Sequence, residues 1–261
     1  MSSPGQRCRR RFSPRPRLCQ VGTLPVQGDL RRAFTRWGLP ARIRVDNGVP
    51  WGSDDGHPTE LACWLIGLGI EMVWNPPRRP QANGVVERSQ GVEKNWAEPW
   101  RCADGAELQR RVDETDRLQR EAYAGPGERP RWQEFPGLAH SGRAYQPEEE
   151  ESLWDLERIK THLALYVVRR KVDPLGKVSI YNRPRPVGRA WIGKVVNVGF
   201  DAQECCRVAT GDDGEELRRI PAPEVSREAV MGLRMCYRLP CRPAPCVAAV
   251  GREGEAEHLV E

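Results

Sequence analysis

Two carboxylates of this sequence stand in settings where an acid could take part in chemistry. Asp46 follows the short strand-like segment 41–45 and precedes Asn47 and Gly48, a combination suited to a turn at a strand end. Glu87 lies on a segment with helical spacing behind a proline-rich stretch. Carboxylate oxygens suit Mg2+, and several are needed to hold two such ions beside a phosphate. Taken alone, each acid is most often only a turn residue or a solvated surface charge.

The order and spacing of the two segments are more specific than either acid alone. Residues 44–48 and 75–88 resemble the second and third acidic motifs of the retroviral-integrase-like DDE transposases, and forty residues separate Asp46 from Glu87. Residues 37–40 are also similar to the family, so the resemblance runs from about residue 21 to residue 100. Tyr181, Asn182 and Arg183, followed by Val187 and Gly188, resemble the C-terminal barrel of bacterial insertion-sequence transposases.

The resemblance implies an α/β fold, namely a ribonuclease-H-like integrase core followed by a small all-β barrel. It further implies that Asp46 and Glu87 are catalytic and bind Mg2+ or Mn2+, because two metal ions can activate an attacking hydroxyl and stabilise a leaving oxygen. Lys94, seven residues after Glu87, would approach phosphate as a point charge, or is an exposed structural lysine. We expect further DNA contacts from the arginines near the third motif, Arg78, Arg79 and Arg88.

A second group of basic residues lies in the segment expected to form the barrel. These side chains either contact DNA phosphates or are solvated strand faces, and the sequence leaves both explanations open. The group comprises Arg169, Arg170, Lys171, Arg183 and Arg185.

Hydrophobic periodicity predicts the elements that must position these residues. Helices are expected from Leu24 to Trp37, over 58–68, from Asn83 with an inner stripe of Val85, Ser89, Val92 and Trp96, over 106–122 and over 153–162. Strands are expected over 41–45, 70–74, 164–172, 177–181, 192–198, 205–210 and 217–220. The predicted organisation is a basic segment (1–20), a core remnant (21–124), a linker with a short helix (125–160), a barrel (161–230) and a tail (231–261).

The first acid of the family has no counterpart that we can identify here. Asp29 is the single acid among residues 1–45, and it falls in an expected helix rather than at the end of an apolar strand. We therefore expect an incomplete, N-terminally truncated core with impaired catalysis. Residues 1–20 are either out-of-frame coding sequence or a disordered basic arm that follows the DNA backbone.

Composition excludes several other classes of protein. The 261 residues are 39% hydrophobic and 30% charged, carry a net charge of +5, and contain no apolar run of membrane-spanning length. The nine cysteines are scattered without a CxxC pair, which does not suit a disulfide framework. We expect a protein of the bacterial cytosol that associates with DNA, rather than with a membrane.

Three functions are compatible with these features. The leading hypothesis is a transposase- or integrase-derived DNA-binding protein of DNA transposition, which in the intact family performs integration by transesterification. The alternative is a non-catalytic DNA-binding or subunit-interaction protein that modulates an intact transposase, with self-association or transposase subunits as partners. A structure-specific nuclease of the same fold would need four carboxylates that we cannot locate.

Overall fold

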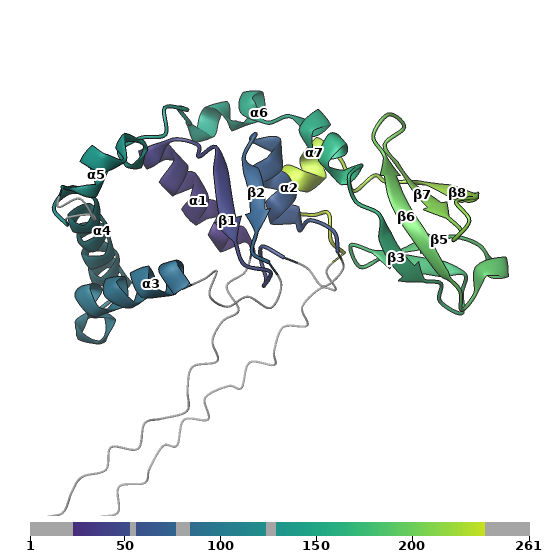
Figure 1. Ribbon diagram of the computed structural model, residues 1–261, viewed down its shortest axis with the longest axis horizontal. Coiled ribbons are helices and arrows are strands. Elements are labelled where there is room, and N and C mark those ends of the chain that lie inside the picture. Colours follow the sequence, from purple (N-terminus) through teal and green to yellow (C-terminus); the bar gives the residue numbers. More distant parts are fainter. Residues whose placement is uncertain (1–22, 53–55, 77–83, 124–128, 238–261) are drawn as a thin grey trace, which may run out of the picture.

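A computed structural model describes residues 23–52, 56–76, 84–123 and 129–237, shown in Figure 1. The fold mixes helices with one parallel and two antiparallel strand arrangements. The helices are α1 (Thr23–Trp37), α2 (Glu60–Gly67), α3 (Gly84–Ala97), α4 (Gly105–Glu121), α5 (Arg131–Glu134), α6 (Glu150–Leu153), α7 (Leu156–Leu163) and α8 (Arg227–Met231). The 3-10 turns are η2 (Pro99–Arg101), η3 (Pro136–Leu138), η4 (Pro147–Glu149) and η5 (Arg189–Trp191). The strands are β1 (Arg42–Val45), β2 (Glu71–Trp74), β3 (Val168–Lys171), β4 (Lys177–Ile180), β5 (Arg183–Pro186), β6 (Val195–Asp201), β7 (Cys206–Thr210) and β8 (Glu216–Pro221).

The first half of the chain centres on a parallel pair of strands beside α1 and α2. β1 and β2 pair in the register Arg42↔Glu71 to Val45↔Trp74, so their carboxyl ends meet at one edge. α2 begins where Thr59 accepts a hydrogen bond from the Ala62 N–H, at 3.2 Å, as an N-cap does. All its residues are buried, which explains why its sequence is almost wholly apolar. The predicted helices and strands of this part are confirmed.

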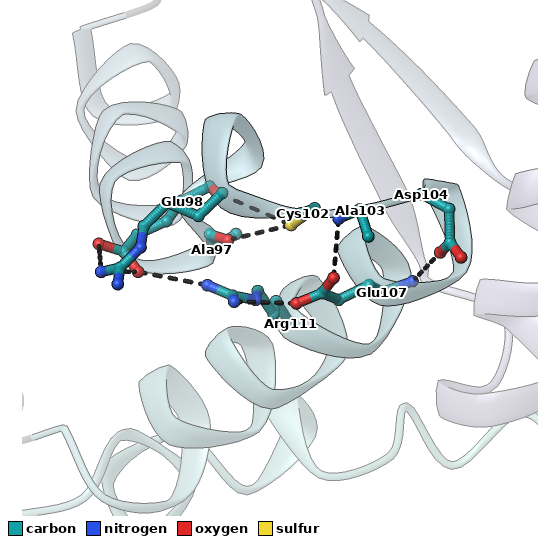
Figure 2. A network of polar contacts seen from close by, with 8 residues as sticks. Ala97, Glu98, Cys102, Ala103, Asp104, Glu107 and Arg111 are labelled. Carbon is teal, nitrogen blue, oxygen red and sulfur yellow. Dashed lines mark hydrogen bonds and ion pairs between the residues drawn. The ribbon is translucent and has the colours of Figure 1, made fainter.

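Helices α3 and α4 form a hairpin to one side of the β1–β2 pair (Figure 1). Their corner is held by charges (Figure 2): Arg111 donates to Glu98 at 3.2 Å and to Glu107 at 2.9 Å. Glu107 also accepts the Ala103 N–H at 2.8 Å, while Asp104 accepts the Glu107 N–H at the start of α4. The backbone bond and then Arg111 lower the pKa of Glu107. These contacts satisfy N–H groups that a helix start leaves without partners.

The C-terminal strands form an open sheet and a hairpin. Within the described residues the pairing order is β3-β6-β7-β8, all antiparallel, with β4 and β5 paired separately. These strands do not close into a barrel, so the small barrel stays a prediction. Sequence analysis missed β5 because its sequence, Arg-Pro-Arg-Pro, contains two residues without an N–H donor. A two-stranded hairpin tolerates them, since β5 has pairing to satisfy on one edge only.

The later part of the segment predicted to be a linker, from Tyr145 on, contributes side chains to the core. Glu150 is 3% exposed, and its carboxylate accepts two bonds from Arg31, at 2.8 and 2.7 Å. The Trp64 indole donates to it at 3.1 Å, and the Tyr145 hydroxyl donates as well. Burial raises the pKa of Glu150, but the donors together outweigh burial and leave that pKa below its ordinary value. Helices α1 and α2 are therefore fastened to residues 145–154 through one carboxylate.

A hairpin tip joins the C-terminal sheet to the first half of the molecule. Tyr181 and Asn182 connect β4 to β5 with positive φ values of 52° and 57°, the conformation of a two-residue type I′ turn. Tyr181 is buried, and its hydroxyl donates to the Pro58 carbonyl at 2.8 Å just before α2. One hydrophobic cluster includes residues of both halves. Tyr181 therefore lies at the joint between the halves.

The segment after α8 also packs against this joint. Leu233 and Met235 are buried, although the sequence suggested a tail from residue 231. The Tyr237 N–H donates to the Tyr181 carbonyl at 2.9 Å, and Arg183 donates to the Met235 carbonyl at 2.8 Å. The packed structure thus extends to residue 237.

Replacing the buried carboxylate should destabilise the fold. We expect Glu150→Gln to lower the free energy of unfolding by about 1.5 kcal/mol, because the hydrogen bonds from Arg31, Trp64 and Tyr145 lose their charged acceptor. The loss should shrink in acid: a lowered folded pKa means that the wild-type contribution disappears as the pH falls through that value. Urea denaturation at neutral and acidic pH measures both effects. The exposed neighbour Glu149 supplies the control, since Glu149→Gln should change stability by less than about 0.5 kcal/mol.

Candidate functional site

Asp46 lies at the carboxyl end of the parallel strand pair. It directly follows the buried Val45, is exposed, and accepts the Gly48 N–H through Oδ1 at 3.1 Å. Asn47 donates to the Asn75 carbonyl at 2.8 Å, which ties the loop after β1 to the loop after β2. Gly52 lies at the end of this loop, where any other residue would clash, because a Cβ atom at position 52 would lie 2.2 Å from the Asn47 carbonyl oxygen. The carboxylate is therefore presented to solvent from a constrained loop.

Aromatic rings lie beside this loop. The Trp74 indole donates to the Trp51 carbonyl at 3.1 Å, and its ring lies 6.3 Å from that of His162, which lies 5.1 Å from that of Tyr166. A hollow of 180 Å³ lies beside Trp74 and Tyr166. It is lined by Asn47, Gly52, Gly56, His57, Pro58, Trp74 and Tyr166.

Glu87 lies in the first turn of α3 and is exposed. Lys94, in the last turn of that helix, is exposed too. Figure 1 shows α3 at the same end of the molecule as the carboxyl ends of β1 and β2, to one side of them. Arg88 is described, whereas Arg78 and Arg79 lie outside the described residues.

The carboxylates suit Mg2+ in their chemistry, but they form an incomplete ligand set. No group of three or more metal-ligand side chains in the described parts of the chain includes Asp46 or Glu87. Two carboxylates provide too few protein oxygens for a pair of Mg2+ ions, which prefer octahedral coordination. Each of these carboxylates by itself could hold such a cation only together with waters or substrate phosphate oxygens.

One group of three possible ligands does occur, on the C-terminal sheet. It consists of Asp201, Glu204 and Cys206. Arg219 donates to both carboxylates at 2.8 Å. Its bonds to Asp201, then Glu216 and Glu204, raise the pKa of Arg219. Arg219 already occupies oxygens of both acids and also pairs with Glu216, so this group is a surface ion-pair cluster.

The basic residues of the sheet fall into two groups. Arg169 and Lys171 are exposed on β3, Arg169 lying 3.8 Å from Asp212. Arg170, between them, donates to the Ser179 carbonyl at 3.2 Å. The Arg183 guanidinium bonds the Met235 and Arg234 carbonyls, and Arg185 pairs with the buried Glu224. Arg169 and Lys171 are thus the members of the set best placed to meet phosphates.

A buried polar cluster behind the joint was missed from sequence. The Arg207 side chain is 1% exposed and lies between the rings of Phe200, at 4.9 Å, and Tyr181, at 5.5 Å. Its Nε lies 3.8 Å from Glu224. Tyr181 also stacks on the buried His57, with ring centroids 5.5 Å apart. Arg207 sits in an alternating strand segment whose pattern gives no signal of inward-facing charge.

Comparison with known proteins adds no family assignment: no model of a protein family matches this chain. Among the described helices, none is both long and apolar enough to cross a bilayer.

The buried His57 should make stability depend on pH. Burial, and then the positive charges of Arg207 and Arg170, lower its pKa from 6.5 to about 3. Between those values the unfolded chain binds a proton that the folded chain does not, so stability falls as the pH drops below 6.5, by about 1.4 kcal/mol per pH unit. We expect His57→Phe to remove this part of the pH dependence in urea denaturation between pH 7.5 and 5.

The exposed His140 gives the matched control. His140→Phe should retain the wild-type slope of stability against pH. Equal slopes for wild type and His57→Phe would show that the buried imidazole is not responsible.

Proposed function

We propose that this chain is a transposase- or integrase-derived DNA-binding protein with a ribonuclease-H-like core that lacks a full set of catalytic acids. The observation that carries the proposal is the position of Asp46: an exposed carboxylate directly after the buried Val45, at the end of a parallel strand, with its loop tied to the loop after the neighbouring strand. Carboxyl ends of parallel strands are where α/β sheets commonly place functional groups. The chain from that second loop leads to α3 and Glu87.

The resemblance of the two acidic motifs gives this position its chemical meaning. In the proposed site Asp46 and Glu87 offer oxygen ligands to Mg2+ or Mn2+, which when bound would polarise a phosphodiester. Lys94 and Arg88, on the helix of Glu87, would meet DNA phosphates. Arg169 and Lys171 would add a second backbone contact from β3. The proposal implies a DNA-associated protein of the bacterial cytosol.

Impaired catalysis follows from the acids present. A two-metal phosphoryl transfer needs ligands that bridge or flank both ions, and we identify two carboxylates in this chain where the family uses three. The proposed activity of the chain on its own is therefore DNA binding.

A second candidate function rests on the small parallel sheet. Within the described residues β1 pairs with β2 alone, whereas parallel strands normally belong to larger sheets covered on both faces. An open strand edge can pair with another chain. This observation favours a protein that joins the assembly of an intact transposase or associates with itself.

DNA binding should be electrostatic and should depend on the exposed cations of β3. We expect the affinity for a duplex to fall linearly with the logarithm of salt concentration, and Arg169→Ala/Lys171→Ala to reduce that slope by about 2 through the loss of two phosphate contacts. Fluorescence anisotropy with a labelled duplex measures it. Arg117→Ala should leave the slope unchanged, because Arg117 is already paired with Glu114 and Glu121.

The catalytic part of the proposal has a separate test. Supercoiled plasmid incubated with the protein and Mg2+ should stay intact, as it should with Asp46→Ala and Glu87→Gln. If the wild-type chain nicks the plasmid and Asp46→Ala does not, the chain is an active nuclease or transferase and the impaired state is refuted. If the protein shows no salt-sensitive binding to a duplex, the proposed DNA-binding function is refuted.

A further inference from the structure

Within the described part of the chain, the stripe of α3 is only partly covered. Sequence periodicity placed Ser89, Val92 and Trp96 on an inner face, but Ser89 is exposed, Val92 is half-buried, and Trp96 is 40% exposed. At the far end of α4, Tyr123 is 50% exposed. Both rings would bury more apolar surface if a partner covered them.

These residues line a groove between α3, α4 and α5. Its volume, 710 Å³, lies in the range typical of ligand sites. The rings of Trp96 and Tyr123 meet edge to face, with centroids 5.6 Å apart and planes at 64°. Such a corner can hold a flat ring against one aromatic face. The lining residues are Gly84, Arg88, Ser89, Val92, Trp96, Gln119, Tyr123 and Arg131.

The positive charge of the groove favours a negatively charged ligand. Among the described residues that line it, Arg88 and Arg131 are the two charged ones, and neither is an acid. The Arg131 guanidinium lies 5.7 Å from the centre of the Tyr123 ring. The exposed Arg88 makes no hydrogen bond or ion pair recorded within the described ranges. A ligand that matches the groove has flat aromatic groups and carries negative charge.

We propose that this groove binds single-stranded DNA, with unpaired bases stacked at Trp96 and Tyr123 and phosphates beside Arg88 and Arg131. Bases in a duplex are stacked on each other, so only an unpaired strand can offer a ring face to these side chains. Stacking on aromatic residues next to cations is the general basis of single-strand binding. The proposal rests on the proposed function only in taking DNA as the polymer, and it does not use Asp46 or Glu87.

The experiment compares a fluorescein-labelled oligo-dT with a duplex of equal length by anisotropy at fixed salt. Trp96→Ala and Tyr123→Ala should each weaken oligo-dT binding about tenfold and leave duplex binding unchanged. Trp96→Phe should restore most of the affinity, because it retains a ring. Trp100→Ala is the matched control: Trp100 is 63% exposed but does not line the groove, so its loss should have no effect.

Several outcomes would overturn the proposal. Equal losses on oligo-dT and duplex, or no loss with Trp96→Ala, would exclude base stacking. Poly-glutamate that binds as tightly as oligo-dT and is equally sensitive to Trp96→Ala would identify an acidic polypeptide as the occupant. A dimer that dissociates in Trp96→Ala by sedimentation, with oligo-dT binding unchanged, would make the groove a contact between copies.

Failure of the groove proposal can be told apart from failure of the proposed function. Loss of salt-sensitive duplex binding in wild type would end the transposase-derived proposal, while groove-dependent oligo-dT binding would still stand. Circular dichroism melting of each variant separates a binding defect from a failure to fold.

Discussion

The arrangement of the first half of the molecule depends on one buried carboxylate. Glu150 takes hydrogen bonds from Arg31 on α1, Trp64 on α2 and Tyr145 in the segment that leads to α6. Each donor lies far from Glu150 in sequence except Tyr145, so the carboxylate connects elements that chain continuity alone would leave independent. A buried acid is tolerated only when its charge is paired and its oxygens are satisfied, and here both conditions hold.

The second connection, at Tyr181, determines how the C-terminal sheet is placed. The hairpin tip inserts its ring beside His57 and the start of α2, and residues 235–237 bond back to it. One apolar cluster contains residues of both halves, so the two halves share buried surface. Arg183 and Arg185 are already engaged, Arg183 with the Met235 and Arg234 carbonyls and Arg185 with Glu224. Of the cations predicted to contact DNA from this part of the chain, the exposed ones are therefore those on β3.

The exposed functional candidates lie away from these two connections. The Asp46 loop follows the parallel strands, and the α3–α4 hairpin stands to one side with its charged corner (Figures 1 and 2). The core is thus fixed by buried pairs, whereas the Asp46 carboxylate and the aromatic groove face solvent. Surfaces positioned by a rigid scaffold in this way are where binding residues are commonly found.

Sequence by itself determined the elements with a strong local signal. Periodicity and capping placed α1, α2, α4, β1 and β2, and the turn residues after Val45 placed Asp46 at a strand end. Charge and apolar content excluded a membrane-spanning helix. The tertiary structure decided what depends on contacts between distant residues. Glu150, one of six acids among residues 148–157, is buried, the described strands leave the sheet open, and the described part of the chain leaves Trp96 of α3 partly exposed. A local pattern records the conformation that a segment prefers, while burial of a charge or exposure of a tryptophan is decided by which segments pack against it.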